Sequence, residues 1–177
     1  MRQTPKTRAL LAYHAAGARL GRRSDLGALV TLCDARLRAH ARRLCDDPDT
    51  ARDIVQDAWI TIARALPGLR DDHAFLAFAL RIVTRAAAKD LGRKRRRRIA
   101  DAGFAQTRPN SEPPACGSDL KAAINALAAP QRAALALFYL DGLSIAEVAL
   151  ALDIPQGTVK TRLMSARARL KAHLEGE

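Results

Sequence analysis

The strongest chemical signal in the sequence is a run of cations and hydroxyl groups near the C-terminus, from Lys160 to His173, that contains no acidic residue. Within it Val159, Leu163, Ala166 and Leu170 recur at the spacing of one buried helical stripe. The side chains between them are therefore expected on the exposed side of a helix. There, Arg and Lys can bind phosphate or guanine, and Thr and Ser hydroxyls can bond to phosphates or to base edges.

The residues just before this helix predict a helix-turn-helix. Ser144 and Glu147 have the spacing of a capping box at a helix N-terminus. Asp153-Ile154-Pro155 ends that short helix, and a second one begins at Gln156. A short helix, a tight turn and a second helix with a basic exposed face are typical of a protein that binds the DNA major groove. The simpler alternative is a helical hairpin with a solvated basic side, which the lack of acids disfavours.

A second motif, from Ala51 to Trp59, has the opposite charge. Helical spacing places one set of side chains on an inner stripe: Val55, Trp59, Ile62 and Leu66. A second set shares the outer face: Asp53, Gln56, Asp57 and Ile60. On a basic protein, an acidic and polar face indicates a protein partner with a basic surface. The alternative is that the two Asp side chains pair with Arg52 or Arg64 on an ordinary exposed helix.

A third region combines an apolar helix with a dense basic run. Phe75 to Leu91 is expected to be helical, and Arg93 to Arg98 consists only of Arg and Lys. Such a run is too charged for a core and is expected to follow phosphates without sequence preference. A solvated tail without a role is the alternative.

These motifs must be positioned by helices. The apolar content is mostly Ala and Leu, aromatic residues make up 4%, and no segment alternates like a strand, so we predict an all-α fold. Pro and Gly residues between 99 and 118 predict a flexible linker between two domains, 1–98 and 119–177. The expected N-terminal helices are Arg8–Leu20, Ser24–Leu44, one from about Pro48 to Pro67, and one from about Asp71 to Arg98. The expected C-terminal helices are Asp119–Ala128, Pro130–Leu140, Ser144–Ala151 and Gln156–Leu174.

Composition restricts the class of protein. A formal charge of +12 and a pI of about 10.7 favour a polyanionic partner. No apolar run approaches the roughly 20 residues that cross a bilayer, so membrane insertion is not expected. The acid-free first 24 residues superficially resemble a targeting peptide, but their near-helical spacing favours an ordinary first helix.

Catalysis, metal binding and cofactor binding are not predicted. The four histidines (His14, His40, His73 and His173) are scattered, and no nucleophile, ligand cluster or phosphate loop accompanies them. Three widely spaced cysteines (Cys33, Cys45 and Cys116) indicate neither a disulfide framework nor a zinc site. Cys33 and Cys45 are expected to be small core residues, and the expected compartment is a reducing cytosol.

Two stretches closely resemble one family. Leu127 to Ala149 and Ile154 to Leu163 are similar to the promoter-binding C-terminal domain of the extracytoplasmic-function sigma factors. Ala51 to Trp59 is similar to that family's polymerase-binding helix, with Arg52 in place of the usual Glu. Phe75 to Leu91 more loosely resembles the helix that melts and binds the minus-ten element. In that helix Phe78 replaces the family's usual Trp, Arg85 replaces its usual Asn, and Lys89 replaces an Asp that is frequent in the family.

The resemblance implies a non-enzymatic cytoplasmic initiation factor that binds core RNA polymerase and promoter DNA, with an anti-sigma protein as a further candidate partner. It implies that the outer face defined above binds the clamp helices of the polymerase's largest subunit. The residues expected at the minus-thirty-five element are Gly157, Thr158, Lys160, Thr161, Arg162, Ser165 and Arg167. Those expected at the minus-ten element are Arg81, Arg85, Lys89, Arg93, Lys94, Arg95 and Arg96. The alternatives are a plain helix-turn-helix regulator and a sigma-like adaptor that sequesters an anti-sigma protein.

Overall fold

The computed structural model describes residues 4–45, 47–101 and 118–175, and every regular element within these ranges is helical. The all-α prediction is confirmed. Within the same ranges, none of the helices combines the length and the apolar character needed to cross a bilayer.

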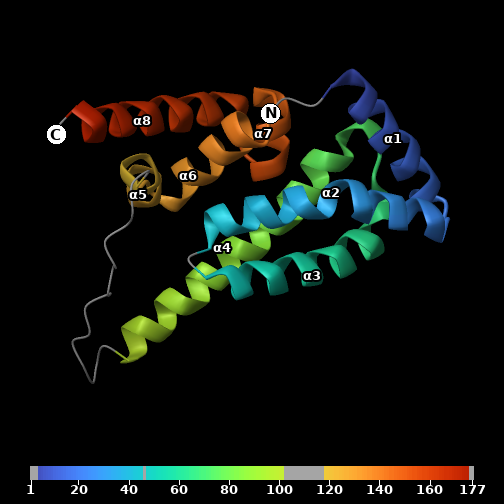
Figure 1. Ribbon diagram of the computed structural model, residues 1–177, viewed down its shortest axis with the longest axis horizontal. Helices are drawn as coiled ribbons and strands as arrows, with labels where there is room; N and C mark the ends of the chain where they lie inside the picture. The colour runs from blue at the N-terminus through green and yellow to red at the C-terminus, as the bar shows by residue number, and fades with distance from the viewer. Residues whose placement is uncertain (1–3, 46, 102–117, 176–177) are drawn as a thin grey trace.

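Four long helices form the N-terminal bundle (Figure 1). Its helices α2, α3 and α4 pack on one another, and α1 packs across one end, against α2. Phe75, Leu80 and Val83 from α4 are fully buried in this core. The helices are α1 (Pro5–Arg19), α2 (Arg23–Leu44), α3 (Pro48–Ala65) and α4 (Phe75–Asp101), with 3-10 turns at Leu66–Gly68 and Asp72–Ala74.

Local sequence explains where α3 begins. The carboxylate of Asp47 accepts hydrogen bonds from the backbone N–H groups of Asp49 and Thr50, and Pro48 occupies the first turn. The Thr50 hydroxyl also donates to Asp47, and these bonds with Thr50 lower the pKa of the Asp47 carboxyl.

The C-terminal helices form the predicted helix-turn-helix. Ser144 and Glu147 make the reciprocal capping box at the start of its first helix. Asp153, in the turn, has a φ of 58°, a left-handed conformation that short polar residues tolerate. The elements are α5 (Ser118–Ala126), α6 (Ala129–Leu135), a π-helical turn (Ala136–Leu140), α7 (Ile145–Leu152) and α8 (Gln156–Glu175).

Several predicted helix boundaries need correction. The helix expected to reach Pro67 ends at Ala65, and the helix expected from about Asp71 begins at Phe75, because short 3-10 turns lie between them. The expected helix Pro130–Leu140 changes to a π-helical turn after Leu135, because its last carbonyl groups bond one residue further along the chain. Of the expected linker, residues 99–101 extend α4 and Ser118 begins α5, whereas residues 102–117, including Cys116, lie outside the described ranges.

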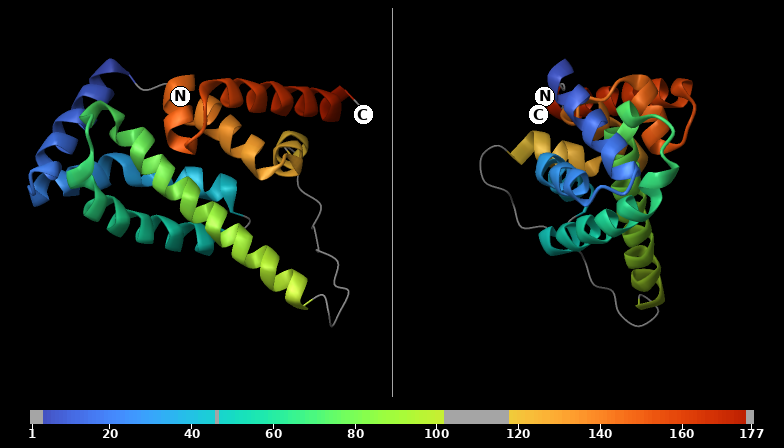
Figure 2. Two further views of the ribbon diagram at one scale, coloured as in Figure 1. Left: turned by 180° about the vertical axis from the view of Figure 1, so that it is seen from behind. Right: turned by 90° about the vertical axis from the view of Figure 1, so that its right-hand side faces the viewer.

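The C-terminal helices lie directly on the N-terminal bundle. Helix α7 packs on α4, and α6 and its π turn reach α2 (Figures 1 and 2). Buried residues from both domains, such as Val83 and Val148, belong to one apolar cluster. Helix α3 lies on the other side of the bundle, away from α5–α8 (Figure 2). The linker predicted two domains and gave no information about contacts between them, and in the structure the two domains pack against each other.

Candidate nucleic-acid and protein interfaces

The outer face of α3 is exposed as predicted. Asp53, Gln56, Asp57 and Ile60 are all exposed, and half of the Ile60 surface faces solvent. On the inner side Val55, Ile62 and Leu66 are buried, while the Trp59 indole N–H donates to Asp34 at 3.0 Å.

The acids of this face keep their charge available for a partner. Among the described residues, neither Asp53 nor Asp57 forms an ion pair, and Arg52 pairs instead with Asp49 at 3.0 Å. The alternative in which Arg52 or Arg64 neutralises this face is therefore not observed. The face remains an acidic and polar surface with one apolar side chain, on a chain of net charge +12.

Two of the cations expected at the minus-ten element, Arg81 and Arg85, point from α4 toward the helix-turn-helix. Their Nη2 atoms lie 3.2 and 2.6 Å from Oδ2 of Asp153. Lys89, one turn beyond Arg85, is exposed. Arg85, expected at the minus-ten element, therefore contacts an acid of the other domain in this structure.

The basic run at the end of α4 is partly neutralised by its own helix. Arg93 and Lys94 both pair with Asp90, and Lys94 also donates to the Thr50 hydroxyl. Arg96 is exposed. The backbone of Arg95 belongs to α4, but its side chain lies outside the described part of the chain.

The expected DNA-binding residues of α8 separate into two groups. Gly157, Lys160, Thr161 and Arg167 are exposed, whereas Thr158, Arg162 and Ser165 are half-buried. The buried stripe is confirmed, with Val159, Leu163 and Ala166 fully covered. Met164 lies in the middle of the exposed face, with 62% of its surface free. Its apolar side chain fits neither phosphate nor hydrogen-bond chemistry, so residue type alone did not place Met164 among the expected DNA contacts.

Gly157 has no positive φ, and a Cβ there would meet no atom within 4 Å of the protein. Steric or backbone strain within the chain therefore does not require glycine at this position, whereas close approach of the backbone to DNA would.

Arg162 and Arg85 share an apolar groove between the two domains. The groove has a volume of about 240 Å³ and lies between α4 of one domain and α6, α7 and α8 of the other. Arg132 also lines it, almost fully buried, and donates to the backbone oxygens of Leu44 and Asn125. A residue expected to contact DNA, Arg162, therefore lies at the domain interface in this arrangement.

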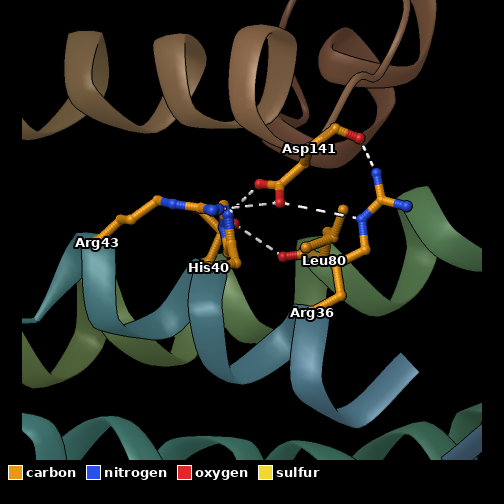
Figure 3. A network of polar contacts seen from close by, with 6 residues as sticks. Arg36, His40, Arg43, Leu80 and Asp141 are labelled. Atoms are coloured by element: carbon orange, nitrogen blue, oxygen red, sulfur yellow. Dashed lines mark hydrogen bonds and ion pairs between the residues drawn. The ribbon is translucent and has the colours of Figure 1, made fainter. Parts of the chain in front are cut away.

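A buried polar network also joins the domains (Figure 3). Asp141, the residue after the π turn, is 1% exposed and lies beside α2. Its Oδ2 lies 2.6 Å from Nδ1 of His40, and its Oδ1 accepts from Arg43 at 3.1 Å. Arg36 donates to the backbone oxygen of Asp141.

The network continues into α4. Nε2 of His40 lies 2.9 Å from the Thr84 hydroxyl, which donates to the carbonyl of Leu80. Burial lowers the pKa of the Arg36 guanidinium, and the charge of Asp141 opposes that shift. Sequence reasoning missed this network, because His40 and Asp141 are 101 residues apart and no local pattern relates them.

No described residues form a group of three or more His, Cys, Asp or Glu side chains that could hold a metal ion.

Comparison with known proteins assigns both domains to one family. The family Sigma-70 region 2 matches residues 29–98, and Sigma-70 region 4 matches residues 118–170. The ECF RNA polymerase sigma-E factor of Escherichia coli strain K12 is 32% identical over 131 residues, which cover 65% of this chain and 69% of that protein.

Solved structures agree with this assignment. The sigma factor RpoE, in complex with the anti-sigma factor NepR from Bartonella quintana, has a TM-score of 0.70 and 29% identity, covering 85% of this chain and 97% of RpoE. CnrH, in complex with the cytosolic domain of CnrY, shares the fold with a TM-score of 0.72 and 24% identity, covering 95% and 99% of the two chains.

The fold and its surfaces define a transcription initiation factor of the sigma-70 class. Within that class, the chain belongs to the extracytoplasmic-function sigma factors, which direct RNA polymerase to promoters. Sigma factors bind core polymerase and promoter DNA and are not enzymes. The plain regulator and the sigma-like adaptor are not favoured.

Proposed function

We propose that this sigma factor acts in the cytoplasm and binds core RNA polymerase through the outer face of α3. The observation that carries the proposal is the state of Asp53 and Asp57, which are exposed and without an ion pair among the described residues. Exposed acids that have no cation partner within a basic chain are electrostatically complementary to a basic surface on a partner protein. Because α3 lies away from α5–α8 (Figure 2), this face is accessible while the domains are packed together.

Helix α4 is the proposed contact with the melted minus-ten strand. Arg81, Arg85 and Lys89 lie along its middle, and the Arg93–Arg96 run extends the basic surface toward its end. Arg side chains stack on bases or hold phosphates, so this helix is suited to bind a single strand with a strong salt dependence.

The exposed side of α8 is the proposed contact with duplex DNA at the minus-thirty-five element. Lys160 and Thr161 offer a cation and a hydroxyl, and Met164 between them offers an apolar contact for a thymine methyl group. Thr158, Ser165 and Arg167 lie at the sides of this face, and Arg162 joins it only when the domains separate.

An anti-sigma protein is a proposed regulator of the chain. The related sigma factor RpoE was solved with the anti-sigma factor NepR bound, and the likeness to RpoE covers 85% of this chain.

Run-off transcription tests the proposed function. Core polymerase with this protein is expected to start transcripts from a subset of a genomic fragment library, and core alone is not. In the same assay Lys160→Ala should lower initiation at all of these promoters, whereas Thr161→Ala should alter preference at one position of the upstream element. A protein that yields no specific starts, or for which neither substitution matters, would contradict the proposal.

A further inference from the structure

Three acidic residues of the C-terminal domain contact the N-terminal domain. Between residues 118 and 175 the structure describes three acidic side chains: Asp141, Glu147 and Asp153. Each pairs with at least one cation of the N-terminal domain. The described side chains of α8 include several cations and no acid.

Asp153 has the most direct relation to DNA binding. Its carboxylate sits in the helix-turn-helix turn and binds Arg81 and Arg85, two cations proposed to hold the promoter strand. A carboxylate bound by two guanidinium groups occupies the place that a DNA phosphate would take. While this contact lasts, the charges of the two arginines are paired with Asp153, although Arg85 itself stays exposed.

Asp141 and Glu147 hold the same domain at two further points. Asp141 inserts between His40 and Arg43 of α2 and is almost fully buried. Glu147 accepts from Arg8 of α1 at 2.5 Å, although it also caps its own helix. Because a buried pair is screened by salt much less than an exposed one, the Asp141 attachment is expected to be the less sensitive of the two to salt.

We propose that these three acids form an acidic latch, Asp141, Glu147 and Asp153, that keeps the free sigma factor closed and unable to bind promoter DNA. In the closed state Asp153 blocks Arg81 and Arg85, and Arg162 lies in the groove between the domains. The outer face of α3 remains open, so the polymerase can bind before the latch opens. The inference relies on the proposed function only in taking α4 as a DNA-binding helix.

Two measurements on the full chain, without polymerase, test the latch. Small-angle scattering reports whether the free protein is compact, and fluorescence anisotropy reports its affinity for a labelled single-stranded oligonucleotide. Asp153→Asn keeps a residue that tolerates the left-handed turn and removes only the charge. Asp49→Asn is the matched control, because it removes the same charge from an ion pair within α3.

The wild-type protein is expected to be compact. Asp153→Asn and Asp141→Asn should each enlarge the radius of gyration and tighten oligonucleotide binding. If the closed state of the wild type outnumbers the open state by roughly ten to one, the gain in affinity should be about ten-fold. Asp49→Asn should remain compact, with little gain in affinity. Arg85→Gln breaks the same pair from the other side, so it should loosen the compact state without any gain in DNA binding.

Several results would overturn the latch. One is an extended wild-type protein at physiological salt, and another is an equal gain in affinity for Asp49→Asn and Asp153→Asn. An Asp153→Asn protein that stays compact and binds the oligonucleotide with wild-type affinity would also contradict it. Asp153 is exposed, so this variant is expected to fold even if the substitution of buried Asp141 prevents folding. These measurements contain no polymerase, so they do not depend on the outcome of the run-off transcription assay. The latch and the proposed sigma-factor function can therefore be refuted independently.

Discussion

The Nδ1 atom of His40 lies 2.6 Å from Oδ2 of Asp141, across the boundary between the two domains. Both side chains are almost fully buried, and the second ring nitrogen contacts Thr84. His40 therefore connects three segments, α2, α4 and the end of the π turn, through polar atoms that have no access to water (Figure 3).

Replacing His40 by Leu should destabilise the protein. The substitution leaves one oxygen of a buried carboxylate without its partner, which costs about 1–3 kcal/mol in the free energy of unfolding. Urea unfolding followed by circular dichroism measures this loss. The matched control is His73→Leu, at an exposed histidine, where a change within about 0.5 kcal/mol is expected. Equal unfolding midpoints for His40→Leu and wild type would show that the network contributes no stability.

Gly17 is expected to resist substitution for a steric reason. A Cβ at this position of α1 would overlap the carboxylate of Asp25, whose Cγ would be 2.5 Å away. Asp25 is itself buried and paired with His14 and Arg22. Gly17→Ala should therefore cost about 1–3 kcal/mol of unfolding free energy.

The control for this substitution is a glycine of the next helix. A Cβ at Gly27 of α2 would meet no atom within 4 Å, so Gly27→Ala should stabilise the protein by about 0.5–1 kcal/mol through helix propensity. Thermal unfolding of both variants gives opposite shifts if the close approach at Gly17 is real. Shifts of the same sign would contradict it.

Local sequence predicted the helices well, because their signals are local. The capping box of Ser144 and Glu147 and the stripe through Val159 and Leu163 depend on residues within a few turns of one another. The outer face of α3 followed from the same periodicity. All of these expectations are confirmed as geometry, whereas their roles in binding polymerase and DNA stay predictions.

The domain interface could not be predicted in this way. Asp141 follows a helix end, and Asp153 lies in a turn. Aspartate is common at both kinds of position for local reasons, so neither residue indicates a distant partner. Their ion pairs join residues 68 to 105 positions apart in the chain. Long-range pairs leave no periodic trace in the sequence, and the Pro-rich linker indicates two domains without indicating how they contact each other.

Cys33 should be almost unreactive in the native protein. Burial raises the pKa of its thiol to about 11, and the charge of Arg36 opposes that shift. Because the thiolate is the reactive species, roughly one thousandth of Cys33 is ionised at pH 8. Labelling with iodoacetamide should rise about ten-fold per pH unit from pH 8 to 10 while the protein stays folded.

Peptide mass spectrometry can follow this labelling at each cysteine separately. Half-buried Cys45 provides a comparison in the same sample, and unfolding in urea should make Cys33 react fully. Rapid labelling of Cys33 at pH 8 would indicate that this part of α2 opens readily.

Asp57→Lys should weaken association with core polymerase. Asp57 is exposed on the outer face of α3, so reversing its charge leaves the buried stripe and the helicity intact. A several-fold loss in co-purification with core is expected from placing a like charge against a basic partner surface. Asp49→Lys, one turn before Asp53 on the same side of α3, shows whether the binding face extends toward the start of the helix. Wild-type co-purification of Asp57→Lys would mean that polymerase binds elsewhere.

Arg85 is the position at which α4 departs most clearly in chemistry from the related minus-ten helices, which usually have Asn there. A short amide can hydrogen-bond an extruded base, whereas a guanidinium stacks on bases or holds phosphate with little sequence preference. We therefore expect weak base selectivity at the minus-ten element and strong salt dependence, with Lys89 and the Arg93–Arg96 run contributing to the latter. Arg85→Asn should sharpen selectivity and lower strand affinity.

Transcription of a promoter library randomised at the minus-ten element, with wild type and Arg85→Asn, measures this selectivity. The substitution also removes the ion pair with Asp153, so the library should be transcribed at saturating protein, where closure of the free chain no longer limits binding. Arg81, which contacts the same carboxylate, supplies the control Arg81→Gln, expected to weaken the domain contact without changing base preference. If wild-type selectivity is already sharp and Arg85→Asn leaves it unchanged, another residue of α4 recognises the minus-ten element.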